Sequence, residues 1–276
     1  MKAVIGIIAG VIAFAAAAGV GLYAYGKEPS KTDTVSIGEF SELNVDATSA
    51  DIIIKQGREN QISYRLPESL VPEIHEENGK LRIVSKSDRL FNFSFTTGKT
   101  YIEITMTADA LEKAQIQVTS GDIEVKGIGI AGSFDTTSGD IEVTGSSLGK
   151  DLQIHATSGD LSIRDSVFGK LESTQTSGDL SMKNVQCSSF SANATSGDFD
   201  VDRLDAENLE IRTTAGDVDC RLTGAERDYR FDLNCTAGDI RVGGSDHGNK
   251  YHSGESADRS CKIETTAGDV EVSFAE

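Results

Sequence analysis

Eight aspartates recur at nearly regular intervals along the chain, and a row of carboxylates is chemistry that could bind calcium. Each follows a Thr-[Ser/Ala]-Gly tripeptide and precedes an apolar residue; they are Asp122, Asp140, Asp160, Asp179, Asp198, Asp217, Asp239 and Asp269. A second acidic position comes two residues later, at Glu124, Glu142, Asp200, Asp219 and Glu271. Calcium takes about six to eight oxygen ligands, mostly carboxylates and carbonyls. The aspartate row is therefore a candidate calcium stripe, and no other cofactor is expected.

The same carboxylates could instead serve the fold. Asp, Ser and Thr side chains bind turn amides, and an amide donor favours the charged carboxylate. Ser162, Ser181 and Arg241 interrupt the second acidic position. The motif also has fewer glycines than the repeats of calcium-binding β-rolls. We therefore prefer the structural role and keep calcium binding as the alternative.

The spacing of the motif predicts how these residues are positioned. Successive aspartates are 18, 20, 19, 19, 19, 22 and 30 residues apart, which indicates a stacked unit of about nineteen residues. Apolar residues alternate with polar ones on both sides of the motif, as at Leu152/Ile154 and Leu161/Ile163. Counted from the Asp, the apolar residues stand an even number of positions before it, as Leu152 and Ile154 do for Asp160, and an odd number after it, as Leu161 and Ile163 do. A straight strand cannot change faces in this way, so the motif is a corner.

A further apolar column lies eight residues after the aspartate and predicts a second bend with another strand. Its members are Ile130, Leu148, Phe168, Cys187, Ala206 and Ala225. The predicted fold is an all-β, single-stranded β-solenoid of ~19-residue coils over residues 113–276. Stacked coils bury a continuous core, whereas the outermost coils need caps.

The first 26 residues are of a different kind. From Ala3 to Tyr25 there is no charge, and these 23 residues exceed the roughly 20 that span a bilayer core. We expect a transmembrane helix over 1–26 and a tether over 27–34. The solenoid would then be extracytoplasmic on a single-pass protein of the cell membrane. A cleaved signal peptide, with Lys2 and the small residues Ala15–Ala18, is the alternative.

Residues 35–112 carry looser β signals and are expected to cap the solenoid. Asn78-Gly79 predicts a tight hairpin. Thr48-Ser49-Ala50-Asp51-Ile52 is a degenerate corner motif. Phe91, Phe93 and Phe95 alternate as in a capping strand, although three neighbouring aromatics could also form a contact surface.

The composition limits the classes of partner that we expect this protein to bind. The net charge is −18, and the chain has 28 Gly, 3 Pro and no Trp. Such acidity argues against nucleic acid, which needs a basic surface, and against adsorption to anionic lipid. The four cysteines, Cys187, Cys220, Cys235 and Cys261, fall on positions that are apolar or small in other repeats. They are expected to be small buried thiols, and a disulfide in an exported protein is the alternative.

Catalytic patterns are weak. Gly145-Ser146-Ser147-Leu148-Gly149 matches a nucleophile elbow, but that chemistry needs a strand-to-helix turn. His247 and His252 share a polar loop with Asp246 and Asp258, at a spacing that specifies no metal. The repeated acids are too uniform for a glycosidase, which needs two carboxyl groups in distinct environments. We expect no catalytic residue and no enzyme activity.

Tandem units such as Thr119–Val125 and Thr137–Val143 resemble the bacterial putative-adhesin β-strand-repeat family, a domain of unknown function that includes LiaG-like envelope proteins. The likeness covers roughly residues 35–276, with departures at the insertions after Gly224 and Gly244. It implies a β-solenoid that is often membrane-anchored, with no established activity.

Three functions follow as hypotheses. The first is an anchored, non-enzymatic envelope protein that presents an acidic solenoid for adhesion, envelope-stress sensing or scaffolding, with an envelope protein or cell-wall polymer as partner. The second is a solenoid that binds or cleaves cell-wall polysaccharide. The third is a scaffold or regulator held on the cytoplasmic face.

Overall fold

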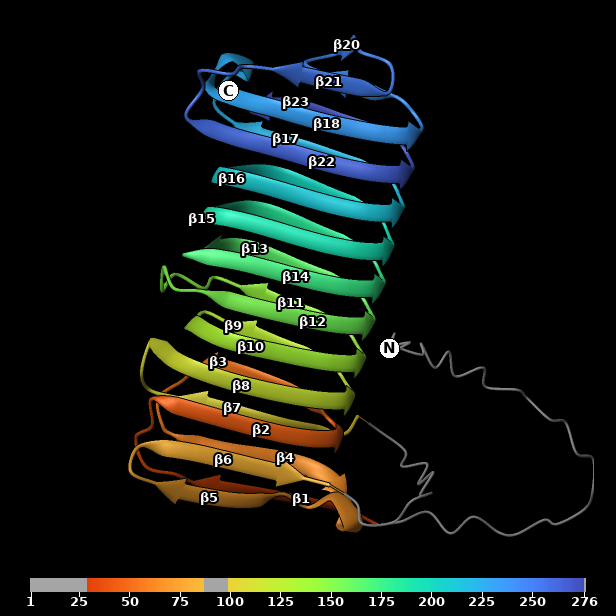
Figure 1. Ribbon diagram of the computed structural model, residues 1–276. Helices are drawn as coiled ribbons and strands as arrows, with labels where there is room; N and C mark the ends of the chain where they lie inside the picture. The colour runs from red at the N-terminus through yellow and green to blue at the C-terminus, as the bar shows by residue number, and fades with distance from the viewer. Residues whose placement is uncertain (1–28, 87–98, 276) are drawn as a thin grey trace, which may run out of the picture.

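The computed structural model describes residues 29–86 and 99–275, and these form a rod of stacked β coils (Figure 1). The all-β prediction is confirmed. The strands are β1 (Ser30–Ser36), β2 (Glu42–Ser49), β3 (Asp51–Gln56), β4 (Gln61–Pro67), β5 (Glu73–Glu77), β6 (Lys80–Ser85), β7 (Tyr101–Met106), β8 (Ala110–Ser120), β9 (Ile123–Lys126), β10 (Gly129–Ser138), β11 (Ile141–Thr144), β12 (Leu152–Ser158), β13 (Leu161–Val167), β14 (Lys170–Ser177), β15 (Leu180–Ser196), β16 (Phe199–Ala215), β17 (Val218–Thr223), β18 (Tyr229–Ala237), β19 (Ile240–Val242), β20 (Ser245–Asp246), β21 (Lys250–Ser253), β22 (Arg259–Ala267) and β23 (Val270–Ala275). Two short 3-10 helices, η1 (Glu68–Leu70) and η2 (Glu226–Asp228), complete the described elements.

Each regular coil contributes one strand segment before its corner and one after it. We call the two resulting stacks the pre-corner sheet and the post-corner sheet. Neighbouring coils pair in parallel and in register: Leu161 lies opposite Leu180, and Leu180 lies opposite Phe199. This register has the nineteen-residue spacing of the sequence repeat. Inward apolar residues of both sheets therefore meet in one core that runs along the rod.

The corner itself requires glycine. Gly178 has φ +124°, and a Cβ there would lie 2.0 Å from the carbonyl oxygen of Gly159 in the neighbouring coil. A side chain would meet both an unfavourable backbone conformation and the next coil. The close stacking of the coils and the Gly of the motif are therefore one constraint.

The predicted second bend is also present. Five residues after the aspartate the chain adopts left-handed conformations, with φ of 49° at Asp165, 52° at Asn184 and 62° at Arg203. The apolar column beyond it is buried at four of its six positions, and Leu148 and Ala225 are only half-buried. Both exceptions lie beside glycine-containing loops that widen the turn.

The coils do not stack in chain order, and this corrects the simple solenoid expected from the repeat. β22 and β23 come last in the sequence, but they lie between the coil of β16 and β17 and the coil of β18 and β19. At the other end, β2 and β3 lie between the coil of β6 and β7 and that of β8 and β9. Each coil from that of β2 and β3 to that of β18 and β19 carries a corner of the same type, so any of these coils can stack on any other. The insertions after Gly224 and Gly244 supply the extra residues that let the chain come back to β22 between two earlier strands.

Antiparallel hairpins cap both ends. β5 and β6 form the predicted hairpin, with φ of 51° at Asn78 and 74° at Gly79. At the opposite end β21 pairs with β18, and β20 pairs with β19. Aromatic rings close this end: the Phe231 ring centroid lies 5.7 Å from that of Tyr251 and 6.3 Å from that of Phe274.

The boundaries near the N-terminus need one correction. The tether expected over residues 27–34 overlaps β1, which begins at Ser30 and pairs antiparallel with β4. The transmembrane prediction for 1–26 and the Phe91, Phe93 and Phe95 hairpin lie outside the described residues. Within the described ranges, no helix has the length and apolarity to cross a membrane.

Candidate functional site

The corner aspartates form one hydrogen-bonded column along the rod. The backbone N–H of Asp140 donates to Oδ1 of Asp122, with an N···O distance of 2.9 Å. The same bond joins every neighbouring pair of corners, at 2.8 to 3.1 Å. The order along the rod is Asp51, Asp122, Asp140, Asp160, Asp179, Asp198, Asp217, Asp269 and Asp239. We call this set the aspartate ladder; the degenerate corner at Asp51 is its first member.

Reversal of the amide direction at the corner explains the ladder. The N–H of Gly139 donates to Ser158 and that of Ile141 donates to Asp160, both in the following coil. The N–H of Asp140, between them, points back to the preceding coil, where a carboxylate supplies the acceptor. Hydrogen bonds to a charged acceptor are stronger than neutral ones, and they offset repulsion along the column. The Ser and Thr hydroxyls of the motif take no part in these bonds.

The carboxylates show no metal geometry in the described ranges, where no three His, Cys, Asp or Glu side chains gather as ligands. The second acidic position does crowd at one place, where Asp219 lies between Asp200 and Glu271 on adjacent coils. Partial burial raises the pKa of Asp219, and Glu271 and Asp200 raise it further. The calcium stripe remains an expectation from the sequence.

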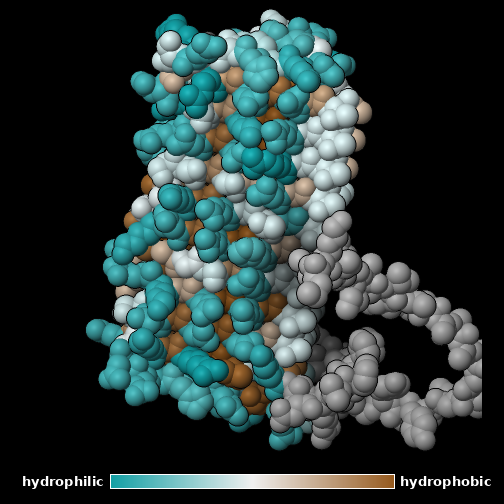
Figure 2. Space-filling view, viewed as in Figure 1, coloured by the Kyte–Doolittle hydropathy of each residue, from teal (hydrophilic) through white to brown (hydrophobic). Residues whose placement is uncertain are grey.

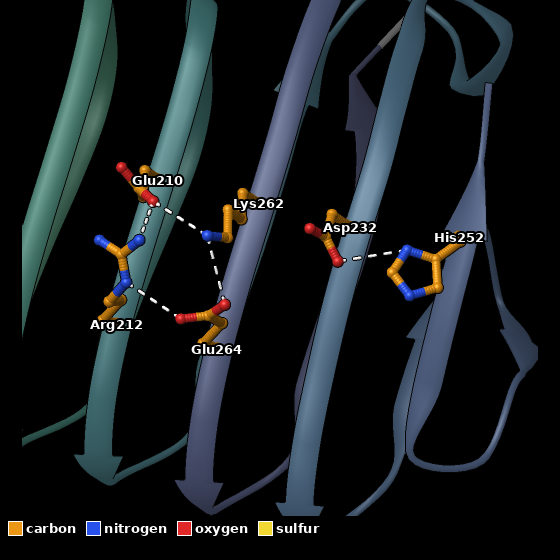
Figure 3. A network of polar contacts seen from close by, with 6 residues as sticks. All are labelled: Glu210, Arg212, Asp232, His252, Lys262 and Glu264. Carbon is orange, nitrogen blue, oxygen red and sulfur yellow. Dashed lines mark hydrogen bonds and ion pairs between the residues drawn. The ribbon is translucent and has the colours of Figure 1, made fainter. Parts of the chain in front are cut away.

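A four-residue ion-pair network fixes the inserted strand β22 to β16 (Figure 3). Nε of Arg212 lies 3.0 Å from Oε2 of Glu264, and the same guanidinium contacts Glu210. Nζ of Lys262 lies 3.4 Å from Glu210 and 3.3 Å from Glu264, which closes the ring. Two acids and two bases alternate, so the network is neutral overall. It ties together residues that are 52 positions apart in the sequence.

A second cluster fixes the start of the same strand. Nη1 of Arg259 lies 2.9 Å from Oδ1 of Asp205 and 3.0 Å from the hydroxyl of buried Tyr229. That hydroxyl in turn donates to the carbonyl of Thr223, at 2.7 Å. Burial raises the pKa of Tyr229. Arg259 therefore joins the coils on both sides of β22.

A shallow groove follows the corner edge of the pre-corner sheet. One stretch of about 530 Å³ runs from Asp46 and Lys86 to Thr174 and Thr176, and another of about 610 Å³ runs from Asn193 to Lys250. The stretches meet where β14 pairs with β15, with Thr174 opposite Asn193. One wall consists of the threonines that stand three residues before the corner aspartates, such as Thr137. The other wall consists of varied polar residues that stand five residues before the same aspartates, such as Asp135. Figure 2 shows a pale stripe of intermediate hydropathy along this edge of the rod.

The remaining sequence candidates do not assemble into a site. Ser146 is buried, and its Oγ accepts the N–H of Ile130 at 3.0 Å, as part of the second bend. The His247 ring lies 4.0 Å from the Tyr251 ring between centroids. His252 instead pairs with Asp232 on β18, with 3.2 Å between Nδ1 and Oδ1 (Figure 3). Neither histidine pairs with Asp246 or Asp258 among the described contacts.

The four cysteines are buried and free, as the preferred sequence reading predicted. Burial raises the pKa of the Cys187 thiol to about 12, and it raises the pKa values of Cys220 and Cys261 as well. Such thiols behave as small apolar side chains.

Sequence reasoning missed both ion-pair clusters and the groove. The clusters depend on the non-sequential position of β22, which no local pattern announces. The groove had a visible signal, because threonine occurs three residues before every corner aspartate, from Thr48 to Thr266. Other outward positions on the same strands vary from coil to coil.

Stacked parallel coils, a glycine corner and a repeated carboxylate acceptor define an all-β protein of the solenoid-like β-repeat class. The chain belongs to the Toastrack family: the model described as Toastrack DUF4097 matches residues 40–273. No curated protein is similar to it in sequence.

Solved structures support the fold. A putative adhesin from Bacteroides fragilis NCTC 9343 is 16% identical, with a TM-score of 0.51 over 89% of this chain and 97% of that one. A putative adhesin from Parabacteroides merdae ATCC 43184 is 12% identical, with a TM-score of 0.51 over 91% of this chain and 97% of that one. At these identities the likeness concerns the fold alone.

Proposed function

We propose that this chain is a non-enzymatic envelope protein that presents a rigid acidic β rod for adhesion, envelope-stress sensing or scaffolding. The observation that carries the proposal is the unbroken aspartate ladder from Asp51 to Asp239. Each coil holds the next through the same bond, so the rod is a stiff support with a repeated surface. Its partner would be an envelope protein or a cell-wall polymer.

The uniform acids favour presentation over catalysis. General acid–base chemistry needs carboxyl groups whose environments push their pKa values apart. The ladder aspartates from Asp122 onward are instead all exposed. Each of them except Asp239, at the end of the ladder, accepts the N–H of the next corner aspartate in the same way. The solved relatives described above are named as adhesins, which agrees with a binding role.

In this proposal the uncharged residues 3–25 anchor the protein in the cell membrane, and the rod lies outside it. β1 begins at Ser30, and the few residues between Tyr25 and Ser30 extend about 3.5 Å each at most. The anchor would therefore hold the β1 end of the rod close to the bilayer. The described groove would extend away from the membrane.

Protease treatment of intact cells that produce the full chain tests this arrangement. We expect an externally added protease to degrade the rod while a cytoplasmic marker survives, and we expect deletion of residues 1–26 to release the rod from the membrane fraction. A rod that is protected in intact cells and degraded only after lysis would contradict export and support the cytoplasmic-face alternative.

The groove favours a second candidate function, the binding of cell-wall polysaccharide. Its walls are hydroxyls, amides and scattered charges, which is the chemistry that recognises a polar polymer. The next subsection develops this candidate.

A further inference from the structure

The groove along the corner edge is long, straight and continuous. From β2 to β21 it crosses ten strands, and at about 4.8 Å per strand it is about 40 Å long. It runs at right angles to the strands, over the outer face of the sheet. A ligand that follows it must be an extended polymer.

The threonine wall is regular and lacks an internal role. Threonine occupies the same position in the nine coils that carry a corner aspartate, from Thr48 to Thr236. No hydrogen bond among the described residues uses any of these nine hydroxyls, so the corner does not need them. Threonine suits a strand, but the other outward positions of these strands carry Gln, Ser, Glu, Asp and Lys without preference. A row of identical, unpaired hydroxyls at the coil spacing suits a ligand with its own short repeat.

The floor of the groove is formed by the residues four before each corner aspartate, such as Thr136 and Thr265, which are only 6% and 4% exposed. These residues alternate with the outward side chains of the two walls and face the core, on the side of Phe134 and Ile263. The groups that can reach a ligand are therefore the outward side chains of the two walls.

The opposite wall restricts the class of polymer. Asp135 and Glu264 alternate with His155, Arg212 and Lys250, so neither sign of charge dominates. A peptide strand would need free backbone groups at a sheet edge, whereas these strands are paired on both sides. Among the residues that the structure describes, no Phe, Tyr or Trp lines the groove, so its walls offer little to an apolar ligand. A neutral chain rich in hydroxyl groups fits all of these features.

We propose that this groove binds an extended, neutral, β-linked glycan, with successive sugars facing successive coils. The inference deepens the second candidate function. Because the described walls carry polar side chains and no Phe, Tyr or Trp, each sugar binds weakly and the affinity grows with the number of coils engaged. Cleavage is not part of the proposal.

Calorimetric titration of the full chain in detergent tests the proposal, with cellohexaose and cellobiose as probes. We expect cellohexaose to bind at least tenfold more tightly than cellobiose, and hydroxyethyl cellulose to retard the protein in a native gel. Polygalacturonate, an anionic chain, should bind less well than hydroxyethyl cellulose. Absence of binding to both β-linked probes, or preference for polygalacturonate, overturns the proposal.

Variants assign the binding to the groove. Thr137→Val, Thr157→Val and Thr176→Val combined keep the branched side chain and remove three hydroxyls, and we expect at least a tenfold loss of cellohexaose affinity. Ser133→Ala with Ser191→Ala removes hydroxyls from the same sheet outside the groove and should leave affinity within twofold. If the valine variant does not fold, Gln117→Leu with Asn193→Leu tests the opposite wall, with the same expected loss. Wild-type affinity in a folded wall variant overturns the assignment. Protease accessibility on cells reports separately on the presenting role, so the two proposals fail independently.

Discussion

The N–H of Asp269 donates to Oδ1 of Asp217 at 2.8 Å, although Asp239 lies between them in the sequence. Asp239 stacks beyond Asp269 and donates to it in turn, at 2.9 Å. The ladder therefore follows the order of coils in space and ignores their order in the chain. Because each corner offers the same donor and acceptor, the repeat tolerates this rearrangement without losing a bond.

Removal of a ladder carboxylate should destabilise the rod. Asp160→Ala leaves the N–H of Asp179 without its acceptor, and we expect a loss of about 1–3 kcal/mol in the free energy of unfolding. Asp160→Asn retains an acceptor oxygen and should lose less. Urea titration followed by circular dichroism measures both. Asp239→Ala is the matched control, because that carboxylate accepts no bond among the described residues and its loss should cost little. Equal effects of the Asp160 and Asp239 changes would contradict the ladder.

The corner glycine should tolerate no side chain. Gly178→Ala places a Cβ 2.0 Å from the Gly159 carbonyl oxygen at φ +124°, so we expect severe destabilisation or no folded protein. Gly149→Ala also has positive φ, 66°, but meets nothing within 4 Å. That control should lose only about 1 kcal/mol. Thermal unfolding compares them, and similar Tm values would mean that coil stacking does not impose the glycine.

The ionised carboxylate of Asp219 should destabilise the rod at neutral pH, relative to low pH where this carboxyl group is protonated. Its folded pKa is raised above the ordinary value of 3.8, so the folded state binds the proton more tightly and this contribution falls as pH rises from 3.8 through the folded pKa. Asp219→Asn removes the penalty and should raise Tm by a few degrees at most at pH 7, because the group is largely solvated. The two proteins should converge below about pH 3.8. A lower Tm for the variant at pH 7 would show that Asp219 is stabilising.

Arg259 should hold the inserted coil in place. Arg259→Gln breaks the ion pair with Asp205 and weakens the bond to the Tyr229 hydroxyl, and we expect a loss of about 1–2 kcal/mol in unfolding free energy. Hydrogen exchange should accelerate in β18 and β22 before it does so in β12. Arg230→Gln, at an exposed position on β18, is the control and should change neither quantity. Uniform acceleration along the rod would argue against a local role.

The cysteines should react only after unfolding. The chain has 4 cysteines, and all are buried and free in the structure. Burial raises their pKa values, so few thiolates exist at pH 8 and a thiol reagent should label none of the four in the native protein. Labelling in denaturant without reductant should then give four. A count of two or zero would reveal a disulfide.

Local regularities made most of the coil predictable. The phase change at Ile154 and Leu161 located the corner, and the Asn78-Gly79 pair located a hairpin, because both follow from side-chain period and turn chemistry. The position of β22 between β16 and β18 was not predictable, since identical corners specify that coils stack without specifying which ones. We predicted that the threonines bind amides of the corner, and for that reason we did not predict the groove. The prediction for threonine was wrong, because the aspartate carboxylate and no hydroxyl accepts the corner N–H.

The place of the last coil also decides how the rod yields to force. A stack built in chain order ends in a coil with one neighbour, and a pull on that end peels the coils away one at a time. Here Ala275 ends β23, which has β17 on one side and β19 on the other. A pull at Ala275 first loads the pairing with β17, and to remove β23 it must also break the pairing of Val270–Val272 with β19, so this strand is held more firmly than the last strand of a stack built in chain order.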